Sequence, residues 1–176
     1  MEGSCKKEEE KKKKGGTGVS PVQFFKITRI TLPHWQKPGK VYFITWKCKK
    51  GEVLLAEERT ITLEALHYWD NRKWTLYAAV IMPDHVHALA QPLPCSQNVG
   101  IYDLAEIIHS IKSFSVHQIN QRRGRRGSFW QDERYDRIVR DEAEFLEELQ
   151  YIMNNPLKKE LVQNWEDYPW LYIKND

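Results

Sequence analysis

Three runs along the chain have the composition of β-strands. The segment 41–46 is rich in β-branched and aromatic residues, and the segments 74–82 and 85–91 are largely apolar. Such side chains pack well on a pleated surface, so each run predicts a strand. The last two runs are separated only by Pro83 and Asp84. Because so short a break leaves no room for a crossover, these two strands are expected to form an antiparallel hairpin.

Apolar residues three and four positions apart predict helices over residues 60–71 and 103–120. Thr62 is placed to cap the first of them. The apolar face of the second helix consists of Leu104, Ile107, Ile108, Ile111, Phe114 and Ile119. Beyond this helix, a short strand is predicted near residues 137–140.

A further helix is predicted to begin at Asp141, whose side chain is suited to cap it. Glu144 stands three residues later, as in a capping box. The expected buried stripe of this helix consists of Phe145, Leu149 and Ile152. Pro156 is expected to end the helix, because the residue before a proline is disfavoured in the α conformation.

These elements predict an α+β fold, with two main helices packed against a small, mainly antiparallel sheet. A chain of 176 residues is most simply one domain, which we assign to residues 21–176. The strands lack the glycine fingerprint of a nucleotide-binding βαβ unit. Residues 1–20 consist largely of Lys, Glu and Gly. Such a segment buries too little apolar surface to order itself, so a disordered tail is expected.

The charge and composition of the chain limit the kinds of partner and cofactor that are expected. No apolar run approaches the roughly 20 residues of a membrane span, and the N-terminus has no apolar signal region. A cytoplasmic protein without a membrane partner is therefore expected. The three cysteines are far apart, which favours neither a disulfide framework nor a thiolate zinc site. The net charge is only +3, yet one segment is strongly basic. This segment contains Arg122, Arg123, Arg125 and Arg126.

Two histidines interrupt the third strand. His85 and His87 are two positions apart, so they project from the same face of the strand. Neutral imidazole is a common metal ligand. Two unpaired polar groups on a buried face would be costly, so a metal ion, or a carboxylate and a water molecule, should satisfy them. An accidental pair without any metal remains the alternative.

Tyr151 and Asn155 are four residues apart, so they share one face of the last helix, away from its buried stripe. The phenol can act as a nucleophile, and a carboxamide oxygen can bind a hard metal ion. Together with two imidazoles, the carboxamide would leave open positions on a divalent cation for a phosphate oxygen. The alternative is that Tyr151 is an amphipathic helix residue and Asn155 a helix stop.

Taken together, these segments resemble the single-tyrosine HUH transposases, in which two histidines flank a hydrophobic residue. Within that family the chain is most similar to the REP-associated tyrosine transposases. The resemblance extends from about Val41 to Trp170. The motifs that carry it are Met82–His87, Ile107–Phe114, Phe129–Gln131, Tyr135–Glu142, Tyr151–Pro156 and Tyr168–Trp170.

The resemblance implies a ferredoxin-like or RRM-like HUH endonuclease fold that acts in DNA transposition. His85, His87 and Asn155 would bind Mg²⁺ or Mn²⁺. Tyr151 would attack single-stranded DNA, leaving a 5′-phosphotyrosine link and a free 3′-hydroxyl, and the substrate would be a REP-like hairpin. Asp84 replaces a common asparagine and is either a turn residue or a partner that orients a histidine. Tyr135 is a competing nucleophile, but it lacks a carboxamide four residues later.

Contacts to DNA are expected on the basic segment, because phosphate contacts dominate nucleic-acid affinity. Besides its four arginines, Lys112 is a candidate, and Trp130 is suited to stack on unpaired bases. A solvated loop with core aromatics behind it is the alternative. Two other functions remain open: a catalytically silent hairpin-binding protein, and an unrelated metallohydrolase. Whether the protein is a monomer or a homodimer is also open.

Overall fold

A computed structural model describes residues 39–95 and 99–175. The predicted tail of residues 1–20 lies outside the described residues. Five strands form one sheet in the order β4-β1-β3-β2-β5, and every neighbouring pair is antiparallel. The strands are β1 (Val41–Cys48), β2 (Trp74–Ile81), β3 (His85–Pro92), β4 (Trp130–Val139) and β5 (Leu171–Ile173). The predicted α+β class, with its antiparallel sheet and hairpin, is confirmed.

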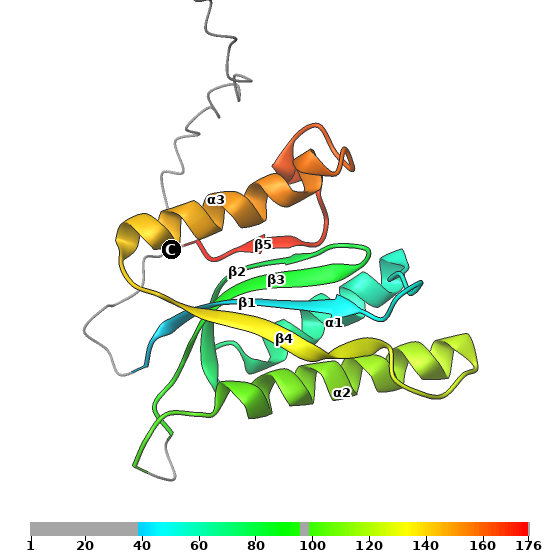
Figure 1. Ribbon diagram of the computed structural model, residues 1–176, viewed down its shortest axis with the longest axis horizontal. Helices are drawn as coiled ribbons and strands as arrows, with labels where there is room; N and C mark the ends of the chain where they lie inside the picture. The colour runs from blue at the N-terminus through cyan, green and yellow to red at the C-terminus, as the bar shows by residue number, and fades with distance from the viewer. Residues whose placement is uncertain (1–38, 96–98, 176) are drawn as a thin grey trace, which may run out of the picture.

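The helices cover both faces of this sheet (Figure 1). The helices α1 (Ala56–Trp69) and α2 (Leu104–Arg123) lie on one face, and α3 (Glu142–Lys158) lies on the other. A short 3-10 helix, Trp165–Asp167, leads into β5. No helix in the described part of the chain combines the length and the apolarity that crossing a bilayer requires.

Two separate cores explain why the strands are apolar on both faces. In β1, Ile44 and Trp46 pack in the core under α1 and α2, whereas Phe43 packs in the core under α3. In β2, Ala79 packs in the core under α1 and α2, and Ala78 packs in the core under α3. Each fully buried large apolar side chain stabilises the fold by about 1.5–3 kcal/mol. The sheet is therefore a rigid central layer that can position side chains on either face.

The first helix begins four residues earlier than its predicted start. The reason is Glu58, whose Oε2 atom accepts a hydrogen bond from the Leu55 backbone N–H at 2.7 Å and so satisfies the helix start. Thr62 is not a cap: it is buried inside the helix, where its hydroxyl donates to the Glu58 carbonyl. In α2, Phe114 departs from the predicted apolar face, because its side chain is 52% exposed.

The last helix starts as predicted but ends later. Asp141 caps it by accepting a hydrogen bond from the Glu144 N–H at 2.9 Å. The Glu144 carboxylate accepts a hydrogen bond from the Arg140 backbone N–H, whereas a capping box would pair it with the N–H of Asp141. Pro156 lies within the helix, which continues to Lys158. Pro156 has no backbone N–H to donate to the carbonyl four residues earlier. The helix nevertheless continues past it for two residues, so this proline lies in the last turn rather than ending the helix.

Strand β4 is longer than predicted, and it anchors α3 from the side. The guanidinium of Arg137 forms ion pairs with Glu144 and Glu148 of α3 and lies 5.9 Å from the centre of the Phe43 ring. The predicted stripe of Phe145, Leu149 and Ile152 is buried against the sheet. These contacts set where the second half of α3 lies over β1 and β3.

Candidate active site

The two histidines project from β3 toward α3. Their ring centroids are 4.7 Å apart. In the neighbouring strand β1, Thr45 pairs with His87 and Lys47 pairs with His85. The backbone therefore holds both imidazoles side by side, on the face of the sheet that α3 covers.

Each imidazole is oriented through its Nδ1 atom. Nδ1 of His85 lies 2.6 Å from Asp84 Oδ1, and Nδ1 of His87 lies 2.7 Å from Thr45 Oγ1. When Nδ1 carries the hydrogen, Nε2 has a free lone pair for a metal ion. Asp84 is thus more than a turn residue, because its carboxylate orients a candidate ligand.

The environment of His87 keeps its ring neutral. Burial, followed by the nearby His85 and the Lys47 charge, lowers the pKa of His87 to about 3. A ring that stays neutral at physiological pH does not need to lose a proton before it coordinates a cation. The cause is mainly desolvation, which disfavours the charged imidazolium.

Helix α3 brings Tyr151 and Asn155 over the histidines. The Tyr151 ring lies 5.1 Å from the His87 ring and 5.8 Å from the Phe43 ring, both in edge-on contact. Its side chain is still 40% exposed, so the phenol is accessible. Lys158 places its ammonium group 5.1 Å from the centre of the Tyr151 ring. A phosphate that approached Tyr151 would therefore meet a cation.

Asn155 is only 6% exposed, yet within the described residues its carboxamide makes no hydrogen bond. Its carboxamide atoms are not among the fully buried polar atoms without a partner in the described residues, so they remain open to solvent or to a ligand. Together with two oriented imidazoles, its oxygen forms a donor set that fits a divalent cation. The described residues contain no cluster of three His, Cys, Asp or Glu side chains, so this mixed set is the metal-site candidate.

All four predicted residues line one open cleft of about 530 Å³. The structure therefore brings together the two segments that are about 60 residues apart in the chain. Sequence reasoning had missed several residues that line this cleft. They are Phe43, Thr45, Lys47 and Lys159. Three of these alternate along β1, but only the pairing of β1 with β3 shows that they lie beside the histidines.

Tyr135 also lines the cleft, from β4. It lies opposite Thr45 in the pairing of β4 with β1 and is 59% exposed. Only Tyr151 of the two tyrosines has a ring in contact with His87 among the described residues. This geometry favours Tyr151 as the nucleophile.

The basic segment lies apart from this cleft, at the end of α2, and most of its arginines are engaged. Arg123 forms two 2.5 Å hydrogen bonds with the buried Glu58 and a third, of 3.1 Å, with Glu52. Arg125 also pairs with Glu52, and Arg122 pairs with Glu57. Arg126 is exposed and has no ion pair within the described chain. Of the four arginines, Arg126 is thus the most accessible for a contact with a phosphate.

The two remaining predicted contacts are also structural in this arrangement. Trp130 is 2% exposed, and its indole N–H donates to Ser115 Oγ at 2.9 Å. A ring covered in this way is not available to stack on an unpaired base, because β4 carries it into the core. Lys112 donates to the Gln131 carbonyl at 2.5 Å, which ties α2 to β4. It lines a second pocket, on the opposite face of the sheet.

The candidate site thus places two imidazoles on the sheet beneath a tyrosine on a helix. Comparison with known proteins identifies the family of the chain. The family described as "Transposase IS200 like" matches residues 40–155, more than half of the chain. The protein therefore belongs to the IS200-like transposase family.

Similarity to individual proteins points to one branch. Over 103 residues the chain is 27% identical to a Haemophilus influenzae protein assigned as a REP-associated tyrosine transposase. This match covers 56% of the chain and 58% of that relative. A solved structure of a REP-associated tyrosine transposase bound to a REP hairpin matches with a TM-score of 0.63 and 21% identity. It covers 80% of this chain and 81% of the other, and it supports the fold. The chain is thus a distant homologue of these transposases.

Proposed function

We propose that the protein is a metal-dependent endonuclease and strand transferase that acts on single-stranded DNA next to a hairpin. The observation that carries the proposal is the convergence of His85, His87, Tyr151 and Asn155 on one cleft. A protein that only bound DNA would not need an exposed phenol beside two oriented imidazoles. The REP hairpin bound by the structural relative suggests a palindromic substrate.

His85, His87 and Asn155 would hold Mg²⁺ or Mn²⁺, which would polarise a phosphate oxygen and so favour attack on the phosphorus. The chain supplies the rest. Asp84 and Thr45 fix the two rings in the orientation that leaves Nε2 free. Burial keeps His87 neutral. Lys158 and Lys159 contribute positive charge where the phosphate would lie.

In the proposed step, Tyr151 Oη attacks the phosphorus of a phosphodiester. A bond forms between Oη and phosphorus, and the bond from phosphorus to the 3′-oxygen breaks. The phenolic proton leaves to solvent, and the departing 3′-oxygen takes up a proton. The products are a 5′-phosphotyrosine link and a free 3′-hydroxyl. Because one phosphodiester replaces another, the reverse attack by a new 3′-hydroxyl needs no nucleotide cofactor.

The test is a covalent-adduct assay on a pool of labelled DNA hairpins with single-stranded flanks, in the presence of Mg²⁺ or Mn²⁺. Tyr151→Phe should abolish the protein–DNA adduct. Tyr135→Phe is the matched control, because it removes another exposed hydroxyl from the same cleft. Adduct formation by Tyr135→Phe at near wild-type levels is expected.

Equal adduct formation by Tyr151→Phe and the wild type would reject Tyr151 as the nucleophile. Hairpin binding without any adduct, across both metals and all hairpins, would instead identify a catalytically silent DNA-binding protein. Metal-dependent cleavage that survives the loss of Tyr151 would favour a metallohydrolase.

A further inference from the structure

Tyr135 is the aromatic side chain of the cleft whose ring is left free. It is 59% exposed, and within the described residues its ring has no aromatic contact and its hydroxyl has no hydrogen bond. The other rings of the cleft are engaged. Phe43 is only 6% exposed, and the Tyr151 ring packs edge-on against Phe43 and His87. Tyr135 therefore offers an uncovered aromatic face inside the same cleft as the candidate nucleophile.

The sheet places this ring in one row with the candidate active site. Tyr135 of β4 lies opposite Thr45 of β1, and Thr45 lies opposite His87 of β3. Side chains that are directly opposite in neighbouring antiparallel strands share a face of the sheet. With strands about 4.8 Å apart, the backbone of Tyr135 lies roughly 10 Å from that of His87. The ring is thus close enough to contact a nucleotide next to one held at the histidines.

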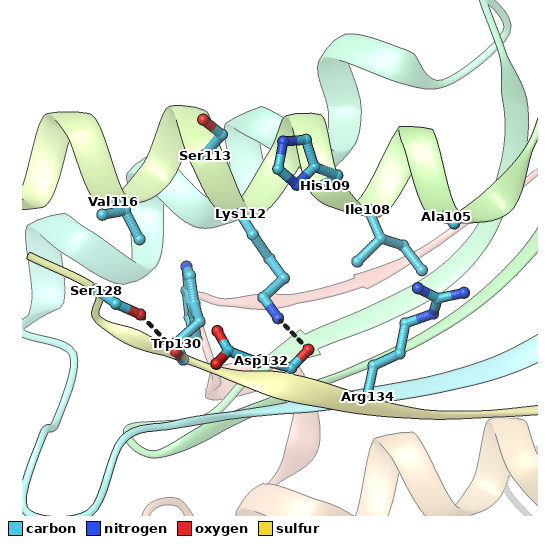
Figure 2. Close-up of a pocket in the computed structure, with 10 residues that line it drawn as sticks. All are labelled: Ala105, Ile108, His109, Lys112, Ser113, Val116, Ser128, Trp130, Asp132 and Arg134. Atoms are coloured by element: carbon cyan, nitrogen blue, oxygen red, sulfur yellow. Dashed lines mark hydrogen bonds between the residues drawn. The ribbon is translucent and has the colours of Figure 1, made fainter.

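The side chain of Tyr135 points away from α2. Figure 2 shows that the neighbouring Arg134 points into a pocket between α2 and β4, and adjacent strand residues point to opposite faces. Strand β4 is also the outermost strand of the sheet, next to β1 alone. The row from His87 to Tyr135 therefore ends at an edge of the sheet, where a DNA strand can leave the cleft.

The charges around the cleft favour a path across the strands rather than along α3. Lys47 and Lys159 line the cleft, and neither forms an ion pair within the described chain. At the other end of α3, residues 137–148 contain five carboxylates and two arginines. Phosphates are attracted to the first group and repelled by the second. A strand that is bound at Tyr151 is therefore expected to avoid the start of α3.

We propose that the Tyr135 ring stacks on the base of an unpaired nucleotide next to the scissile phosphate, and so positions that phosphate for Tyr151. Aromatic side chains bind single strands in this way, because every base has a π face. The proposal rests on the proposed function for its ligand, single-stranded DNA. It adds a DNA-binding residue and the direction in which the strand leaves the cleft. The role needs the ring and not the hydroxyl.

The test measures DNA binding by proteins that carry Tyr151→Phe, in which the covalent step is blocked. The probe is a labelled hairpin with single-stranded flanks, in which each unpaired position in turn is made abasic. Tyr135→Leu should weaken binding to the intact probe about tenfold, as expected for the loss of one base–aromatic stack. Tyr135→Phe keeps the ring and should bind like the parent protein.

The decisive result is the coupling between the ring and one base. An abasic site at one unpaired position should weaken binding by the parent protein about as much as Tyr135→Leu does. The same abasic site should have little further effect on Tyr135→Leu, because the two changes remove the same contact. A fluorescent adenine analogue at that position should be quenched on binding by the parent and by Tyr135→Phe, and much less by Tyr135→Leu.

Tyr68→Leu is the matched control. Tyr68 is also an exposed tyrosine, at 54%, but it lies on α1 and does not line the cleft. This variant should bind like the parent at every position. Tyr135→Thr is a second ring-free variant that suits a strand, and it should behave like Tyr135→Leu. Unchanged binding by both ring-free variants would overturn the proposal, as would a loss that adds to that of every abasic site.

The two proposals fail in different ways. Normal adduct formation by the wild type, together with unchanged binding by Tyr135→Leu, would reject only the stacking role. Coupling at one position without any adduct would support the stacking role and reject the endonuclease. Absence of hairpin binding by the parent protein would overturn the stacking proposal as well.

Discussion

At the residue scale, the candidate site depends on how two imidazoles are held. His85 is oriented by the neighbouring carboxylate of Asp84, which is exposed, whereas His87 is buried beside Thr45. The His85 side chain is 12% exposed and His87 is 5% exposed, so the two rings are both largely covered but are held by different partners. Burial keeps the His87 ring neutral at physiological pH, and this has a measurable effect on stability.

Acid should destabilise the protein through His87. Its pKa is about 3 in the folded protein and near 6.5 when the chain is unfolded. Between these values the unfolded state binds a proton that the folded state does not, so stability falls as the pH falls below about 6.5. The expected loss is about 1.4 kcal/mol per pH unit within this window.

The measurement is urea unfolding of the wild type and of His87→Asn from pH 7 to pH 4, without divalent metal. Asparagine does not titrate, so the wild type should lose stability faster than the variant as the pH falls. Parallel curves for the two proteins would contradict the assignment of a buried, neutral His87.

At the element scale, the end of α2 acts mainly as a clamp on α1. Arg123 pairs with the buried Glu58, the same residue that satisfies the backbone at the start of α1. Arg125 extends the network to Glu52. The positive charge of the basic segment, which the sequence suggests as a DNA-binding loop, is therefore largely neutralised by glutamates. Its arginines have different roles.

Arg123→Ala and Arg126→Ala should separate these two roles. Removal of Arg123 leaves Glu58 buried without its partner and should cost about 3 kcal/mol of unfolding free energy. Arg126 is exposed, so its removal should leave stability within about 0.5 kcal/mol. Removal of Arg126 should instead weaken hairpin binding and reduce its salt dependence. Denaturant titration and binding at several salt concentrations test both effects, and a large stability loss in Arg126→Ala would refute this division.

At the scale of the whole molecule, three layers bring the site together. The histidines lie on β3, the central strand of the sheet, and α3 lies across this face of the sheet (Figure 1). The buried stripe of α3 and the ion pairs of Arg137 hold the helix in place. A cation bound by His85, His87 and Asn155 would join β3 to α3. It should therefore stabilise the native state as a whole, because the unfolded chain does not preserve this donor set.

Mn²⁺ or Mg²⁺ should raise the thermal unfolding temperature. At a hundredfold excess over the dissociation constant, the gain is about 2.7 kcal/mol. His85→Ala should lose this gain, and Tyr151→Phe should keep it. Asp84→Ala should weaken metal affinity by about 10–100-fold, because it removes the group that orients His85. Asp84→Asn should lose less, since a carboxamide oxygen can still accept from Nδ1. A shift of the same size in His85→Ala would place the metal elsewhere.

Much of the fold was predictable because local patterns and packing agree. The hairpin of β2 and β3 follows from two apolar runs with a two-residue break, and the start of α3 follows from its cap at Asp141. The errors have two kinds of cause. Glu58 bonds the backbone three residues earlier and moves the start of α1, and the last turn of α3 accommodates Pro156, so both of these are local details that the pattern did not reveal. The strand β5 depends on a distant contact, because its three residues form a strand only beside β2.

The sequence by itself determined the α+β class. It also singled out the two histidines, the tyrosine and the asparagine as candidate site residues, and it showed their resemblance to one family. These depend on periodicity and residue chemistry, which are local properties of the chain. Only the tertiary structure decided that Thr45 and Asp84 orient the histidines, that Trp130 is buried, and that Arg123 is already paired. Strand register and ion pairing join residues far apart in the chain, and no local pattern encodes which partner each will meet.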